Sequence, residues 1–113
     1  GFGHISIRPH IYTLSSVESV TPTIRGSVTI RYSRVSEDEY TLTVGIPPNM
    51  QANIYLPVEE GRSVRRVLAD GAPVKITERM RQGAYVFVGA VSSGEYTYTV
   101  TTGRESRPEP PFR

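Results

Sequence analysis

Hydrophobic and polar residues alternate along most of this chain. In the segment 28–32, Val28 and Ile30 fall on one side, and Thr29 and Arg31 fall on the other. Successive side chains of a strand point to opposite faces, so this pattern predicts a strand with one buried face and one wet face. The same period of two recurs in four further segments: 4–8, 40–46, 52–56 and 96–100.

Turn sequences separate these strands. Asp70-Gly71 lies between two short apolar runs, and it predicts a tight hairpin because both central positions of a type I′ turn need a positive φ. The Pro-Pro-Asn run at 47–49 predicts the end of one strand and a turn into the next. The segment 84–91 is apolar on both faces, which indicates a central strand or one covered by another domain.

The remaining segments add no helix to this picture. The best helical candidate, 76–81, is short and lacks capping residues, and the segment 9–23 predicts a long connection or an edge strand. Regularly spaced strands of this kind are typical of sandwiches and barrels. We therefore expect an all-β fold, an antiparallel β-sandwich that is jelly-roll-like and has about eight strands.

The length of 113 residues fits one domain. We expect the β-sandwich over residues 1–102 and a flexible, proline-rich tail over residues 103–113, because proline cannot donate to a strand ladder. The chain begins directly inside a predicted strand, so we expect it to be part of a longer polypeptide.

Charge and cysteine content remove several function classes. The net charge is only +2 and the arginines are scattered, so we expect no nucleic-acid partner. No apolar run is long enough to span a bilayer, and we expect no membrane partner. The absence of cysteine excludes disulfides and fits either an oxidising or a reducing compartment. We expect a periplasmic or secreted location over a cytoplasmic one.

The ionisable residues do not form a catalytic pattern. Nearly all acidic residues lie in predicted turns or in the tail, and the run 37–39 is the only tight group. A hydrolytic glycosidase needs two carboxylates across the sugar, and a metal site usually needs three or more ligands. His4 and His10 are the only histidines, and neither has an acidic residue close in sequence. We expect no catalytic residue, no metal and no cofactor in this chain.

Aromatic rings are the candidates for binding a carbohydrate. Tyr55 falls on a predicted polar face, and Tyr85 and Phe87 share a face of the next apolar strand. Exposed rings of this kind can stack on the apolar face of a sugar. The alternative is that these three rings cover the sheet or contact a neighbouring domain.

Four segments resemble the C-terminal β-sandwich of bacterial family 78 α-L-rhamnosidases. The opening GFGHISIRPHI is similar to a G-[FY]-x-H-I-x-I-x-P pattern common in that family. Further matches, in the same order, are the segments 23–30, 46–57 (IPPNMQANIYLP) and 93–96. The resemblance covers most of the chain to about Val100, and 46–57 is its most specific part.

The resemblance implies a role beside another domain. In such enzymes an (α/α)6 barrel hydrolyses terminal α-L-rhamnosyl residues with inversion, and the β-sandwich packs on that barrel. It implies that this chain is a non-catalytic accessory domain whose partner is the barrel of the same polypeptide. The opening segment would then lie nearest the active site, so we hypothesise that His4 or His10 lines the sugar pocket of the intact enzyme.

Two other functions remain open. The chain can be an independent carbohydrate-binding module that uses Tyr55, Tyr85 and Phe87 to bind rhamnose-containing glycans, although it has no tryptophan. It can also be a free-standing enzyme, but the sequence offers no acid pair, triad or metal site. Shared fold never establishes function by itself, so the missing sites count as much as the matched segments.

Overall fold

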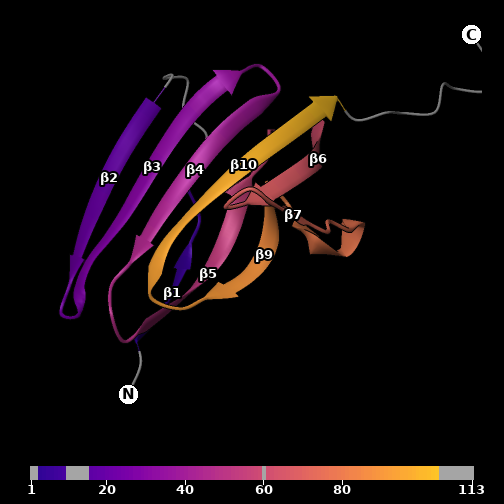
Figure 1. Cartoon of the computed structure of the whole chain (residues 1–113). Coiled ribbons are helices and arrows are strands. Elements are labelled where there is room, and N and C mark those ends of the chain that lie inside the picture. The colour runs from indigo at the N-terminus through magenta and orange to yellow at the C-terminus, as the bar shows by residue number, and fades with distance from the viewer. Residues whose placement is uncertain (1–2, 10–15, 60, 105–113) are drawn as a thin grey trace, which may run out of the picture.

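The computed structural model describes residues 3–9, 16–59 and 61–104, and these form ten strands and one short 3-10 turn (Figure 1). The strands are β1 (Gly3–Ile7), β2 (Ser16–Thr23), β3 (Gly26–Ser36), β4 (Glu39–Ile46), β5 (Met50–Pro57), β6 (Arg62–Ala69), β7 (Ala72–Val74), β8 (Arg81–Gln82), β9 (Tyr85–Val91) and β10 (Gly94–Arg104). The turn η1 spans Glu78–Met80.

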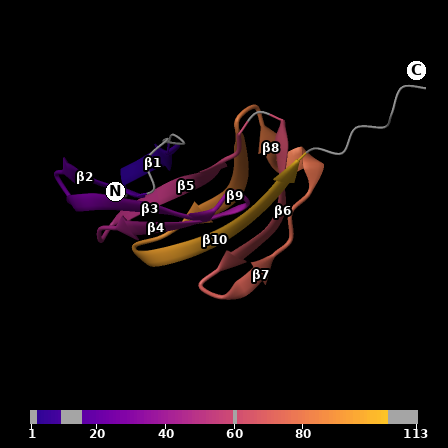
Figure 2. The ribbon, with the colours of Figure 1, turned by 90° about the horizontal axis from the view of Figure 1, so that it is seen from above.

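The strands form two sheets that lie face to face as two layers (Figure 2). One sheet has four strands in the order β1-β5-β9-β8, and the other has six in the order β2-β3-β4-β10-β6-β7. The predicted all-β sandwich is confirmed. The strand number exceeds the expected eight because β2 lies in the segment 9–23, which the sequence left open as a connection or an edge strand, and because β8 has only two residues.

One strand pair departs from the expected antiparallel arrangement. β1 pairs with β5 in parallel, and Ile5 lies opposite Ala52. Parallel neighbours need a long crossover connection. Here β2, β3 and β4 supply it, because all three belong to the six-stranded sheet before the chain returns beside β1.

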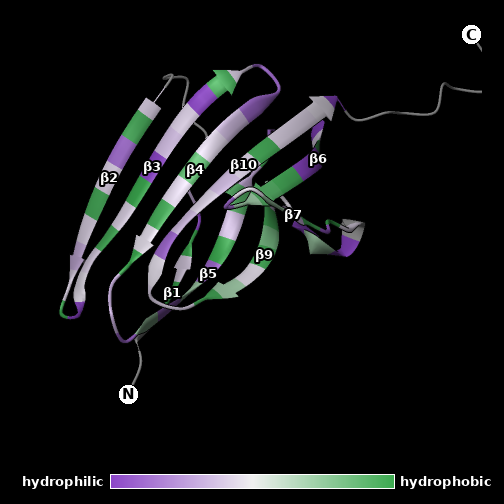
Figure 3. Ribbon diagram, in the orientation of Figure 1, coloured by the Kyte–Doolittle hydropathy of each residue, from purple (hydrophilic) through white to green (hydrophobic). Residues whose placement is uncertain are grey.

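The alternating side chains meet between the two sheets. Buried and half-buried residues alternate along the whole of β4. In the opposite layer, buried residues also occupy every second position of β5 from Met50 to Leu56. Figure 3 shows the matching hydrophobic and hydrophilic bands along these ribbons. The largest fully buried side chains are Tyr32, Leu42, Ile54, Leu56, Val44, Val58, Val67 and Val100. Burial of their apolar surface, worth about 25 cal/mol per Å², holds the layers together.

The turn predictions hold in their details. Asp70 has a φ of 51° and Gly71 a φ of 86°, and the two join β6 to β7 as the predicted tight hairpin. Asn49 also has a positive φ, 59°, where the chain passes from β4 in one sheet to β5 in the other. Asparagine adopts this conformation more readily than most residues, which fits its place at the crossing.

Gly26 allows two of the segments that carry the family resemblance, 23–30 and 46–57, to pack closely together. Its φ is 124°, and a Cβ built on it would lie 2.8 Å from the Cβ of Pro47. The turn between β2 and β3 therefore packs directly against the crossing between β4 and β5. Only glycine permits both this backbone conformation and this close approach.

Three further predicted segments have defined positions. Residues 16–23 form β2, an edge strand as predicted, and the segment 84–91 contains β9, which lies inside its sheet between β5 and β8. The best helical candidate reduces to η1. β10 extends to Arg104, two residues past the expected end of the sandwich, and residues 105–113 of the expected tail lie outside the described residues.

Two stacked tyrosines fill the core between β3 and β4. The ring centroids of Tyr32 and Tyr40 are 5.2 Å apart. The Tyr40 hydroxyl donates a hydrogen bond of 2.8 Å to the backbone oxygen of Pro57 and so ties the two sheets together. The Tyr32 hydroxyl is buried and has no hydrogen-bond partner among the described residues.

These two hydroxyls should contribute differently to stability. We expect Tyr40→Phe to lower the free energy of unfolding by about 1–2 kcal/mol, because it leaves a buried carbonyl without its partner. Tyr32→Phe should be neutral or slightly stabilising, because it removes a buried hydroxyl that has no partner in the described part of the chain. Urea unfolding of both variants checks this, and equal destabilisation by the two would contradict it.

Burial also predicts a loss of stability at alkaline pH. Desolvation raises the pKa of Tyr40 well above its ordinary value of 10.0, and it also raises the pKa of Tyr98, with a contribution from Asp70. The unfolded chain therefore loses these protons first. The free energy of unfolding should be unaffected below about pH 10 and should fall above it, by up to about 1.4 kcal/mol per pH unit for each tyrosine.

The measurement is a series of urea unfolding curves between about pH 9 and pH 11. The matched control is Tyr40→Phe, which should show a shallower decline because one of the two titrating groups is missing. Parallel declines in the two proteins would show that Tyr40 does not carry the effect.

Candidate functional site

The three aromatic residues that the sequence offers as candidates for carbohydrate binding meet on the outer face of the four-stranded sheet. Tyr55 lies between buried Ile54 and Leu56 on β5, so its side chain points away from the core. The register places Tyr55 opposite Phe87 and Pro57 opposite Tyr85. The Tyr55 centroid is 5.1 Å from that of Phe87 and 6.4 Å from that of Tyr85. The sequence grouped Tyr85 with Phe87, and the strand pairing adds Tyr55.

Arg8 completes this cluster. Its guanidinium carbon lies 4.3 Å from the centroid of the Tyr55 ring, within the range of a cation–π contact. The Tyr85 hydroxyl donates a 3.4 Å hydrogen bond to the backbone oxygen of Arg8. We call Arg8, Tyr55, Tyr85 and Phe87 the aromatic patch. Arg8 was not among the residues predicted from the sequence, although the alternation of segment 4–8 places it on the outer face.

The geometry of the aromatic patch bears on what it can bind. The Tyr55 ring is tilted 41° from Phe87 and 84° from Tyr85, and the Arg8 guanidinium covers part of the Tyr55 face. The three rings are half-buried and form a packed cluster, not a coplanar platform. Such a cluster offers mainly ring edges and a cation. Stacking of sugars on these rings stays a prediction.

Only one of the two histidines lies in the part of the chain that the structure describes. His4 is exposed and pairs across the sheet with Gln51. His10 lies outside the described residues. Their contribution to a sugar pocket stays a prediction.

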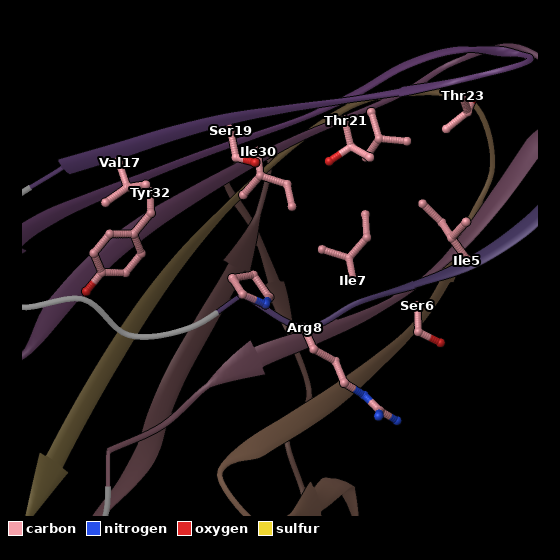
Figure 4. Close-up of a pocket in the computed structure, with 12 residues that line it drawn as sticks. Ile5, Ser6, Ile7, Arg8, Val17, Ser19, Thr21, Thr23, Ile30 and Tyr32 are labelled. Atoms are coloured by element: carbon pink, nitrogen blue, oxygen red, sulfur yellow. The ribbon is translucent and has the colours of Figure 1, made fainter.

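A groove of about 360 Å³ opens between the edge strands of the two sheets (Figure 4). Ile5 and Ile7 of β1 form one wall, and Ile30 lies on the opposite wall. Ser19 and Thr21 of β2 add hydroxyl groups to that opposite wall. The side chain of Arg8 points away from the groove in Figure 4. The groove thus has an aliphatic and hydroxyl lining with no carboxylate among its described residues.

Four carboxylates of the described structure are engaged at the surface. Glu18 pairs with Arg31 at 2.8 Å, Glu59 pairs with Arg34 at 2.6 Å, and Asp38 pairs with Arg62. The Asp70 carboxylate accepts a 2.9 Å hydrogen bond from the backbone of Thr97. Each is an ordinary role for an acidic residue in a turn or at a strand end.

The charged side chains of residues 3–9, 16–59 and 61–104 lie at or near the surface. No charged side chain in this part is buried, and no three potential metal ligands lie together there. The part of the chain that the structure describes also contains no helix long and apolar enough to cross a membrane.

The protein is thus a small β-sandwich module. Its most distinctive surface is the outer face of the four-stranded sheet, where aromatic rings and an arginine lie together. The model of the bacterial alpha-L-rhamnosidase C-terminal domain matches residues 1–69. The chain belongs to this family, and the resemblance seen in the sequence is confirmed. The match includes β1 and the crossing between β4 and β5.

Solved structures show the same fold. An alpha-L-rhamnosidase from Dictyoglumus thermophilum aligns with a TM-score of 0.67 and 18% identity, over 88% of this chain and 11% of that chain. A Streptomyces avermitilis alpha-L-rhamnosidase complexed with L-rhamnose aligns with a TM-score of 0.63 and 24% identity, over 85% of this chain and 9% of that one. This chain thus spans about a tenth of the length of these proteins. No curated protein sequence matches it.

The contact between Arg8 and Tyr55 should be measurable as a coupling energy. A double-mutant cycle of Arg8→Met and Tyr55→Leu should give about 0.5–1 kcal/mol, the range of exposed cation–π contacts. The control is a cycle of Arg31→Met and Tyr55→Leu, which should give no coupling because Arg31 is on β3 of the other sheet. Urea unfolding supplies the free energies, and equal coupling in both cycles would contradict the contact.

Proposed function

We propose that this chain is a non-catalytic accessory domain at the C-terminus of an α-L-rhamnosidase. It packs on the catalytic domain of the same polypeptide, an (α/α)6 barrel, and stabilises that domain. The observation that carries the proposal is the family match over residues 1–69. The periplasmic or secreted location expected from the sequence stays a prediction within this proposal.

The chemistry of the described residues supports a non-catalytic role. Glycoside hydrolysis needs a protonated carboxyl group and a second carboxylate held across the scissile bond. A raised carboxyl pKa usually comes from burial, and no charged side chain is buried in the described structure. Three of its carboxylates are each paired with an arginine instead, on separate elements.

The length of the solved relatives supports a partner in the same chain. Each of those α-L-rhamnosidases contains about ten times more polypeptide than this chain covers. A β-sandwich of this size buries a modest core, and contacts with a larger neighbour stabilise both sides. Glycan binding by the aromatic patch is the competing function, because three rings do gather on one face.

Deleting residues 1–104 from the full-length enzyme tests the proposal. We expect the melting temperature of the catalytic domain to fall by several degrees, because an interface worth a few kcal/mol is lost. The matched control deletes only residues 105–113 and should leave that temperature unchanged. Calorimetry of the catalytic transition is the measurement, and identical melting after both deletions would reject the stabilising role.

Two assays of the isolated chain distinguish the competing functions. A chromogenic α-L-rhamnoside should not be turned over, and titration with rhamnose or a rhamnose-terminated oligosaccharide should give no saturable heat. Saturable heat would favour the carbohydrate-binding module and direct attention to Tyr55, Tyr85 and Phe87. Turnover by the pure chain would overturn the non-catalytic assignment.

A further inference from the structure

The two outer faces of the sandwich differ in chemistry. On the six-stranded sheet, threonines alternate with the core residues of β4 and β10, and Thr43 lies within 3.2 Å of Thr97 across the strand pair. Hydroxyl-rich faces of this kind remain favourably hydrated. The outer face of the four-stranded sheet instead carries Tyr55, Tyr85 and Phe87. Of the two faces, this one gains more from being covered, since aromatic rings bury a large apolar area.

Arg8 supplies a charge for which the described residues offer no partner. Three other arginines, Arg31, Arg34 and Arg62, each pair with a carboxylate. Arg8 is exposed, and in the described part of the chain its guanidinium contacts the Tyr55 ring and no carboxylate within ion-pair distance. A carboxylate arriving from outside would find a guanidinium already positioned on the ring face, which lowers the entropy lost on pairing.

The path of the chain brings the rest of a longer polypeptide to this side. In a C-terminal domain, the preceding polypeptide reaches the fold through its first strand, which here is β1. β1 forms one edge of the four-stranded sheet, and Arg8 follows it directly. The four-stranded sheet, which carries the aromatic patch, is therefore the sheet to which a preceding domain is attached. The attachment lies at the Gly3 end of β1, whereas Arg8 follows the other end of that strand.

We propose that the aromatic patch is the surface on which the catalytic domain of the same polypeptide docks. This inference rests on the proposed function. The rings receive aliphatic side chains of the partner, and Arg8 receives a carboxylate of the partner. Interfaces between domains bury about 600–1,500 Å². The patch alone covers only part of such an area, so the outer positions His4, Ser6 and Asn53 belong to the same interface.

Hydroxyl-radical footprinting of the intact full-length enzyme tests the docking face without any mutation. Tyrosine and phenylalanine rings react with the radical faster than valine does. Left uncovered, the half-exposed rings Tyr55, Tyr85 and Phe87 should be oxidised at least as fast as Val20, which is 65% exposed on β2. If the catalytic domain covers them, we expect them to be oxidised about tenfold more slowly than Val20, as befits residues at the centre of an interface.

A charge reversal in the full-length enzyme tests the electrostatic part. Arg8→Glu should lower the melting temperature of the catalytic domain by about 2 °C or more, because a carboxylate of the partner would then face another carboxylate. The matched control is Arg31→Glu, which reverses an exposed arginine on the six-stranded sheet and should leave that temperature unchanged.

The outcomes separate this inference from the proposed function. Slow oxidation of the rings together with an effect of Arg8→Glu alone supports docking on the aromatic patch. If deletion of residues 1–104 destabilises the catalytic domain while the rings are oxidised rapidly and Arg8→Glu is silent, the accessory role stands and this docking face is rejected. Protection of Val20 and Ile24 in place of the rings rejects it as well. If the deletion has no effect and no residue is protected, both proposals fail.

Discussion

The rest of the structure depends on one constraint: β4 and β5, which lie in opposite sheets, both bury every second side chain in the core between the sheets. Leu42 and Val44 of β4 and Ile54 and Leu56 of β5 are fully buried between the sheets. The chain passes from one layer to the other at Asn49, so these two strands are consecutive in sequence yet belong to opposite sheets. A slip of one residue in either strand would turn its apolar side chains to solvent.

Because the core uses the inner positions, the positions left for function lie on outer faces, edges and turns. The outer face of the six-stranded sheet is dominated by threonines, while that of the four-stranded sheet collects the aromatic patch. The edges of the two sheets leave the groove between β1 and β2, which has an aliphatic and hydroxyl lining. This distribution suits recognition of another surface better than acid–base chemistry, which needs desolvated carboxyl groups.

The segments that resemble the family serve the architecture. Asn49 allows the crossing between the sheets, and Gly26 allows the turn of β2 and β3 to pack on Pro47 at that crossing. The resemblance to rhamnosidase C-terminal domains thus rests on residues that build the sandwich. Half of the aromatic patch, Tyr85 and Phe87, lies in β9, outside the matched residues 1–69, whereas Arg8 and Tyr55 lie within them.

The sequence by itself determined the strands, the tight hairpin at Asp70-Gly71 and the face on which each residue lies, because these follow from local backbone conformation and a period of two. Only the tertiary structure decided which strands are neighbours. It placed β1 parallel to β5, and it brought Arg8 onto the ring of Tyr55, 47 positions further along the chain. Pairing of distant strands depends on how two whole sheets share one core, and local alternation carries no record of that choice.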